Sequence, residues 1–203
     1  MAQHLKDAIR RCIADAALAT FAEAGLEGAT MAAMAGQAGI STGNLYRYFA
    51  SKQALFSEVV PDAFVAELSG RLGLRLQTSQ EVVDVRELAP GHPYLDASEA
   101  LLDYVIEHRL QTVIVLGRAE GTSYAGLRET LVERLVRAAL DHYGRTNGAR
   151  LGIVLREIYG NYVNSLVVIL RSLEGADEIR EAVEGYQRYH LVGLDALLRS
   201  QAV

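Results

Sequence analysis

The stretch that most constrains this chain is residues 30–52, TMAAMAGQAGISTGNLYRYFASK, because its pattern predicts two short helices joined by a tight turn. Thr30 and Ser41 each stand where a hydroxyl can accept a free backbone N–H at the start of a helix. Gly39 follows the first helix, and glycine is the residue best suited to the left-handed position that ends a helix. The apolar face of that first helix comprises Met31, Met34, Ala35 and Ala38. This arrangement is typical of a helix-turn-helix, whose second helix enters the major groove of DNA.

The second of these helices, predicted from Thr42 to about Phe49, has an inward and an outward face. At about 100° per residue, Leu45 and Phe49 share one face, which must be buried because so short a helix is unstable in water by itself. The opposite face displays small, hydrogen-bonding and cationic groups that suit bases and phosphates. The residues predicted to contact DNA are Thr30, Ser41, Thr42, Gly43, Asn44, Tyr46, Arg47, Tyr48 and Lys52.

The run GISTGNLYRYFASKQALF resembles the signature of the tetracycline-repressor (TetR) family of bacterial transcription regulators. The likeness covers roughly residues 5–60, and it includes Thr30, the Ala-Gly-Ile-Ser turn and the Ser-Lys-x-x-Leu-Phe that starts the next helix. The resemblance implies an all-α protein with a three-helix DNA-binding domain, here residues 1–52, and a larger helical ligand-binding and dimerisation domain, here residues 53–203. Outside the matching stretch, the chain fits the family only in length and helical character.

Charge and composition limit the classes of protein to which the chain can belong. The chain has 203 residues and half of them are hydrophobic, which predicts a globular protein rather than a disordered one. Its net charge of −5 argues against general coating of nucleic acid, and residues 1–60 contain five basic and five acidic residues. Most DNA binders have a basic footprint, so we expect weak non-specific binding here and an affinity that depends on dimerisation.

The cysteine content and the apolar stretches indicate the compartment. Cys12 is the only cysteine, so the chain cannot form an internal disulfide, which fits a reducing environment. Its position on an apolar helical stretch predicts a buried, inert thiol. The N-terminus lacks the apolar core of a signal peptide, and the longest apolar stretches are shorter than the ~20 residues of a membrane span. We therefore expect a cytoplasmic protein without a membrane segment.

The remainder of the chain is predicted to be mostly helical. Residues 3–25 form a first helix that Gly25 ends, and Pro61 breaks or kinks the helix that follows Ser51. Residues 77–94 are expected to form a long loop. A short extended piece is expected in that loop at Val82, Val83 and Val85. Helical structure is expected to return at about Leu95. Further separate helices are expected over residues 127–143, 151–173 and 179–198.

Apolar residues cover more than one face of the helix predicted over residues 151–173. A helix with a wide apolar surface is buried on two sides, and a small domain has few partners for it. A second subunit would supply them if helices 151–173 and 179–198 formed a four-helix bundle across a twofold axis. The alternative is that both helices form the core of a single subunit.

No constellation in the sequence predicts catalysis, a metal site or a cofactor. HExxH, CxxC, GxSxG and dinucleotide-binding patterns are absent, so we expect a protein that is not an enzyme. A ligand pocket is expected among the helices after Leu95, mostly apolar with a few polar groups. The candidate lining residues, each with a structural role as its alternative, are Tyr104, His108, Tyr124, His142, Tyr159, Asn161 and Tyr162.

Together these features predict a homodimeric transcriptional regulator that binds a palindromic double-stranded DNA operator. The resemblance implies repression as the default and release by a small-molecule effector, and activation stays open. The alternative from another class is an all-helical small-molecule binding protein or enzyme whose helix-turn-helix is only scaffold. Tyr46 and Arg47 favour the regulator, because an idle scaffold has no reason to display them. A ligand-independent DNA-organising protein is disfavoured by the acidic chain.

Overall fold

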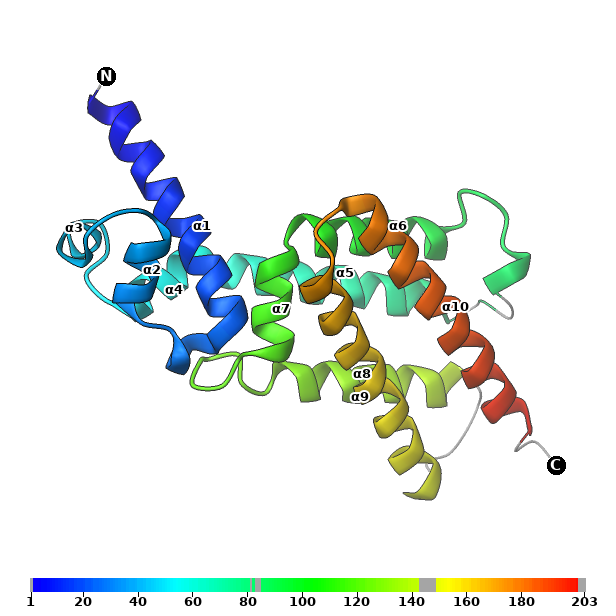
Figure 1. The fold of residues 1–203 in the computed structure, drawn as a ribbon. Coiled ribbons are helices and arrows are strands. Elements are labelled where there is room, and N and C mark those ends of the chain that lie inside the picture. The colour runs from blue at the N-terminus through cyan, green and yellow to red at the C-terminus, as the bar shows by residue number, and fades with distance from the viewer. Residues whose placement is uncertain (1, 81, 83–84, 143–148, 201–203) are drawn as a thin grey trace. The chain divides into compact units, whose positions relative to one another are not determined.

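The computed structural model consists of helices and their connections (Figure 1). The residues that it describes are 2–80, 82, 85–142 and 149–200. Within these ranges no strand is present, and the prediction of an all-α fold is confirmed.

Four helices make up the N-terminal part of the chain. They are α1 (Ala2–Gly28), α2 (Met31–Gln37), α3 (Thr42–Tyr46) and α4 (Lys52–Val59). Gly25 lies inside α1 with φ 69° and ψ 179°, a conformation that favours glycine and interrupts the helix. The predicted end of the first helix at Gly25 is therefore a break, after which one more turn continues to Gly28.

Pro61 separates α4 from α5 (Asp62–Thr78). Val60 leaves the helical region with φ −127° and ψ 72°, as expected for a residue before proline, and α5 begins directly after Pro61. The predicted break at Pro61 is confirmed. Proline removes a backbone donor, so the helix restarts most easily just beyond it.

The predicted loop at residues 77–94 is shorter and more helical than expected. It contains the 3-10 helix η1 (Val85–Glu87), so the expected extended conformation is wrong for Val85, while Val83 lies outside the described residues. The helix α6 (Pro93–Glu107) starts at Pro93 rather than at Leu95. Proline suits the first position of a helix, and His92 caps it because its Nδ1 accepts the Tyr94 N–H at 3.2 Å.

The later helices match the predicted segments closely. They are α7 (Arg109–Gly117), α8 (Leu127–His142), α9 (Ala149–Ser172) and α10 (Ala176–Ser200). A non-helical His108, with φ −105° and ψ 39°, divides α6 from α7. The predicted end of α8 after Tyr143 falls outside the described residues.

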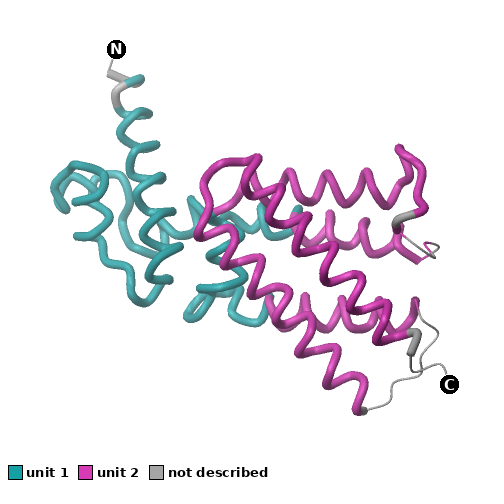
Figure 2. Tube along the Cα trace, turned by 45° about the vertical axis from the view of Figure 1, so that its right-hand side comes forward, with its two compact units in different colours: residues 1–67, 110–127 teal, residues 68–109, 128–203 magenta. Residues whose placement is uncertain are grey.

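The chain divides into two compact units (Figure 2). Unit 1 comprises Met1–Glu67 and Leu110–Leu127, and unit 2 comprises Leu68–Arg109 and Arg128–Val203. Unit 1 therefore extends beyond the predicted domain boundary at residue 52. It includes α4, the start of α5 and all but the first residue of α7. No local pattern in the sequence indicates that α7 packs with the N-terminal helices.

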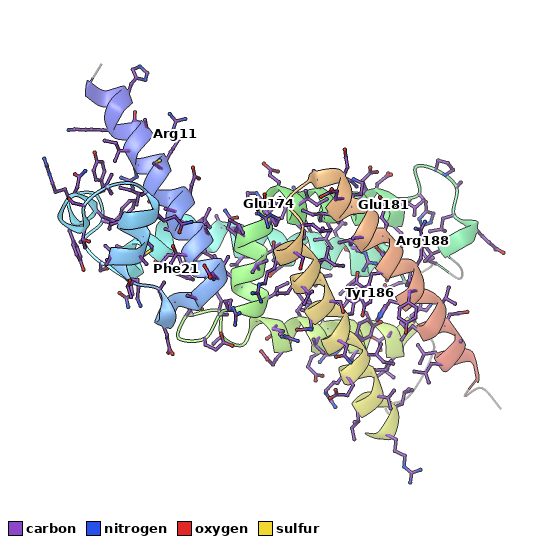
Figure 3. The ribbon with its side chains drawn as sticks, in the orientation of Figure 1. Arg11, Phe21, Glu174, Glu181, Tyr186 and Arg188 are labelled. Carbon is purple, nitrogen blue, oxygen red and sulfur yellow. The ribbon has the colours of Figure 1, made fainter. Side chains whose placement is uncertain are left out.

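The core of unit 1 is built from aromatic and aliphatic side chains. Its fully buried members include Ile13, Phe21, Met34, Leu45 and Leu55. The rings of Phe21, labelled in Figure 3, and Phe56 meet edge to face, with centroids 5.3 Å apart and planes at 78°. This contact joins α1 to α4, so the first helix supports the short helices that follow.

Cys12 is exposed, so the prediction of a buried thiol is wrong. The fully buried stripe of α1 begins at Ile13, and the described residues before it are exposed or half-buried. The apolar spacing in the sequence begins before Ile13, but the fully buried positions among the described residues of α1 begin only there.

The core of unit 2 lies between its long helices. Leu155 and Leu170 of α9 and Ile179 and Leu198 of α10 are fully buried. Polar groups tie α9 to its neighbours as well, since Arg109 donates from Nη1 to the Leu170 carbonyl at 2.7 Å. One face of α9 is thus used inside a single subunit.

Candidate nucleic-acid interface and effector cavity

Two hydroxyl caps hold the helix-turn-helix in shape. Thr30 Oγ1 accepts the Ala33 N–H at 3.1 Å, and Ser41 Oγ accepts the Asn44 N–H at 3.2 Å. Gly39 has φ 68°, the left-handed conformation that ends α2. All three features agree with the sequence prediction. The turn is therefore determined by a few adjacent residues.

The α3 helix presents the faces that the sequence predicted. Leu45 is fully buried and Phe49 is buried, whereas Gly43 and Arg47 are exposed and 51% of the Tyr46 surface is accessible. The helix ends at Tyr46 rather than near Phe49, because the Arg47 N–H bonds to the Asn44 carbonyl and the chain turns towards α4. Tyr48 is half-buried in that turn.

The outward side chains Tyr46 and Arg47 are not engaged by the part of the chain that the structure describes. Neither Tyr46 nor Arg47 makes a side-chain hydrogen bond, ion pair or ring contact with any residue that the structure describes. Gly43 has no positive φ, and a Cβ added there would meet no atom within 4 Å. The fold itself therefore does not require glycine at this position.

Lys52 has a structural role that the sequence did not reveal. Its Nζ donates to the Ala29 carbonyl at 2.9 Å and to the Glu27 carbonyl at 3.2 Å, and the side chain is half-buried. These carbonyls lie at and just beyond the end of α1, where backbone acceptors have no helical partner and the helix dipole favours a cation. A phosphate contact by Lys52 would have to share this ammonium group.

We expect the Lys52→Ala substitution to lower the free energy of unfolding by about 1–2 kcal/mol, because two bonds from a charged donor are lost at a partly exposed site. Urea denaturation followed by circular dichroism measures this loss. Gln53→Ala is the matched control, since Gln53 is the exposed neighbour on α4. Equal stability of the two variants would contradict the structural role.

A cavity of about 480 Å³ lies within unit 2, among α5, α6, α8, α9 and α10. Its apolar wall includes Leu76, Val82, Val85, Leu135, Ala138, Ala139, Leu191 and Leu194. Its polar and aromatic groups include Arg75, Tyr94, His142, Tyr159, Tyr162 and His190. Three of the predicted pocket residues, His142, Tyr159 and Tyr162, line this cavity. Arg75, Tyr94 and His190 were not predicted.

The other four predicted pocket residues lie elsewhere. Tyr104 lies beneath the guanidinium of Arg71, 4.8 Å from it, and its ring centroid is 4.4 Å from that of His108. Asn161 is exposed on α9. Sequence position alone could not separate these residues from the cavity lining, because a local pattern does not show which cavity a side chain faces.

Tyr124 belongs to unit 1. Its hydroxyl donates to Asp62 Oδ1 at 2.5 Å, and its ring lies beside that of Phe56 with centroids 6.3 Å apart. Burial and this hydrogen bond raise the pKa of Tyr124 to about 12. The residue thus connects the segment before α8 to the start of α5.

Arg75 is held by neutral partners. Its Nε donates to Ser98 Oγ at 3.1 Å and its Nη2 to the Tyr94 hydroxyl at 2.9 Å. Its guanidinium carbon also lies 5.2 Å from the centroid of the Tyr94 ring. These contacts join α5 to α6 and fix the orientation of the guanidinium at the cavity wall.

His190 stands among aromatic rings. Its centroid is 4.5 Å from that of Tyr162 and 5.2 Å from that of Tyr159. Tyr162 also stacks on the ring of Tyr186, labelled on α10 in Figure 3, at 5.7 Å. Burial, and then the positive charge of Arg75, lower the pKa of His190 to about 4, so the imidazole is neutral at pH 7.

Comparison with known proteins finds a family whose profile matches the N-terminal part of the chain. Residues 13–59 match the profile of the bacterial regulatory proteins of the tetR family. No curated protein matches the chain. The matched residues run from the first buried position of α1 to the end of α4, and they include the complete helix-turn-helix.

One solved structure extends the likeness of fold beyond the N-terminal part of the chain. A TetR-like transcriptional regulator from Rhodococcus sp. RHA1 is 20% identical with a TM-score of 0.50, over 91% of this chain and 96% of that one. A TetR-family transcriptional regulator from Mesorhizobium loti MAFF303099 is 16% identical with a TM-score of 0.41, over 92% of this chain and 96% of that one. The N-terminal part of the chain therefore matches the tetR family of bacterial regulatory proteins, and the all-helical fold of the chain is similar to that of a solved TetR-like regulator.

Proposed function

We propose that the protein is a sequence-specific repressor that leaves a palindromic DNA operator when a small molecule binds to unit 2. The observation that carries this proposal is the capped α3 helix, which displays Tyr46 and Arg47 without partners in the described chain. Arginine can bond bidentately to guanine or bind a phosphate, and a tyrosine hydroxyl can bond to a phosphate. Gly43, which the fold does not require, allows the backbone of α3 to approach DNA closely.

The remaining predicted contacts fit the same surface. Thr42 and Asn44 are half-exposed beside Gly43, and Asn44 can pair with an adenine edge. Thr30 and Ser41 are exposed at the caps. Each hydroxyl oxygen accepts a backbone N–H, and its own hydrogen can be donated to a phosphate. Five basic and five acidic residues in residues 1–60 leave little general attraction to DNA, so specific affinity requires two such heads acting together.

A second copy of the chain is the partner that the surface of α9 and α10 favours. Val154, Asn161 and Val168 recur every seven residues on α9 and are exposed, while the opposite side of the same helix is buried. On α10, Tyr189 and Val192 are 75% and 59% exposed. Exposed apolar side chains in such numbers are typical of an interface. We propose that α9 and α10 pair with their counterparts in a four-helix bundle.

The apolar character of α9 allows a second interpretation. By length and composition alone, its segment Arg150–Ser172 is apolar enough to cross a membrane, with a mean hydropathy of 1.3, which the short apolar runs in the sequence did not predict. However, Glu157, Asn161 and Asn164 are exposed on this helix. Polar groups facing lipid are costly, whereas they can form hydrogen bonds across a protein interface. A cytoplasmic dimer therefore accounts for the surface better.

We expect Val168→Glu to weaken dimerisation by about tenfold or more, because each subunit would place an unpaired carboxylate in an apolar contact. Analytical ultracentrifugation over a concentration series measures the change. Gln77→Glu adds the same group at an exposed position of α5 in unit 2 and should leave the dimer intact. A Val168→Glu protein that stays as dimeric as this control would exclude the face from the interface.

The test of the proposed function is fluorescence-anisotropy binding to DNA from upstream of the protein's own gene, across a salt series. A regulator should bind one palindromic segment tightly, with an affinity that falls steeply as salt rises. Scrambled DNA of the same composition is the control. Absence of binding to every upstream segment at low salt, by protein shown to be folded and dimeric, would reject the proposal in favour of a small-molecule binding protein.

A further inference from the structure

The cavity of unit 2 contains a positive charge that the described chain orients but does not neutralise. Arg75 uses Nε and Nη2 on the oxygens of Ser98 and Tyr94, both neutral. Its Nη1 makes no hydrogen bond, and the guanidinium forms no ion pair, with any residue in the described part of the chain. A guanidinium held at two positions with its remaining N–H groups unused is suited to bind a carboxylate.

Two further hydrogen-bonding groups of the cavity also lack partners among the described residues. Tyr162 of α9 makes ring contacts but no hydrogen bond through its hydroxyl, and Nε2 of His190 on α10 is buried and unbonded. Both groups line the same cavity as Arg75. Buried polar groups are rarely left unsatisfied in proteins, so a ligand that bonds to His190 Nε2 would satisfy a buried group, and the same ligand could also bond to Arg75 and Tyr162.

The charges of the lining favour an anion. Besides Arg75, the described lining contains one arginine, Arg188, and one aspartate, Asp195, so two positive charges and one negative charge leave a net charge of +1. His190 is neutral at pH 7. A cationic ligand would be repelled by Arg75, whereas an anionic ligand would be attracted to it.

The rest of the lining favours an apolar body on the same ligand. Aliphatic side chains from α5, α8 and α10 form most of the wall, and the rings of Tyr159 and His142 complete it. A volume of about 480 Å³ is in the range of pockets that enclose small organic molecules. Arg188 and Val192 are exposed at the edge of this lining, so the cavity reaches the surface of unit 2.

We propose that this cavity binds a small organic carboxylate with an apolar body, its carboxylate on Arg75 and its chain or ring against the aliphatic wall. Tyr162 and His190 supply the neutral contacts to the same end of the ligand. The role of this acid as the effector that releases DNA rests on the proposed function. The binding itself does not.

The test uses the purified full chain and two pairs of probes, decanoate with decanamide and 4-phenylbutanoate with 4-phenylbutanamide. Isothermal calorimetry should show at least one of the acids binding once per chain, about tenfold or more tighter than its neutral amide. Equal binding of acid and amide, or no binding of either acid at millimolar concentration, would overturn the proposal.

Three variants locate the carboxylate. Arg75→Met should weaken binding of the acid by about tenfold or more and leave the amide unchanged. Tyr162→Phe, which removes only a hydroxyl, should weaken binding of the acid by about three- to tenfold. This variant still tests the proposal if Arg75→Met fails to fold. Arg137→Met removes the same charge from an exposed position of α8 and should have no effect. Loss of binding in this control equal to that in Arg75→Met would refute the assignment.

A DNA-binding measurement separates this proposal from the proposed function. Protein that binds its operator but does not distinguish acid from amide would refute the carboxylate site alone. Protein that distinguishes them through Arg75 but binds no upstream DNA would refute the regulator alone. If both hold, adding the acid should release the operator from wild type and not from Arg75→Met, which links the two sites.

Discussion

Replacing Tyr46 and Arg47 together with alanine is expected to abolish specific operator binding and to leave folding unchanged. A bidentate arginine contact to a base contributes about 1–3 kcal/mol to discrimination, and a dimer would lose it twice. The expected loss of affinity is therefore about 30-fold at the least and up to about 10⁴-fold. Stability should change by less than about 0.5 kcal/mol, because both side chains are exposed and form no side-chain hydrogen bond, ion pair or ring contact with a described residue.

Fluorescence anisotropy with the wild-type operator measures this loss, and circular dichroism melting measures stability in the same samples. Arg137→Ala is the matched control, since Arg137 is exposed on α8 of unit 2 and should bind DNA as wild type does. Lys52→Ala is a poor reporter of DNA contact, because its ammonium group also holds the end of α1. If the double variant binds the operator as tightly as the control, α3 is not the helix that recognises the DNA sequence.

Phe21→Ala is expected to destabilise unit 1 by about 3–5 kcal/mol, the usual cost of removing a buried phenylalanine side chain and leaving a cavity. Phe21 is completely buried and meets Phe56 edge to face, so both packing and an aromatic contact are lost. The total stability of a domain is typically about 5–15 kcal/mol, so unit 1 should lose a large share of its stability. DNA binding should fall as unit 1 unfolds, although Phe21 is completely buried and cannot itself contact DNA.

Hydrogen exchange followed by mass spectrometry is the suitable measurement, because it reports on each unit separately when a chain does not unfold in one step. Amides of α1, α2 and α4 should exchange faster in Phe21→Ala, while those of α9 and α10 keep their protection. Leu74→Ala provides a control, since Leu74 is more than half exposed on α5. Unchanged exchange in α1 and α4 would show that this ring does not stabilise the N-terminal helices.

The helix-turn-helix could be predicted from sequence because each of its determinants is local. Thr30 and Ser41 bond to backbone groups three residues away, and Gly39 adopts its conformation without help from distant residues. The inward direction of Leu45 and Phe49 follows from helical spacing alone. The breaks at Gly25 and Pro61 were predictable for the same reason, since both depend on the backbone properties of single residues.

Contacts between residues distant in sequence required the tertiary structure. The sequence by itself determined the all-α class and the helix-turn-helix, through caps, turns and periodicity that act within a few residues. Only the folded chain brought Arg75, Tyr162 and His190 to one cavity and engaged Tyr124 with Asp62 in unit 1. It likewise directed Lys52 to the end of α1. Helical spacing specifies which face a side chain occupies, but the helix that faces it depends on how the whole chain packs, and no local pattern encodes that choice.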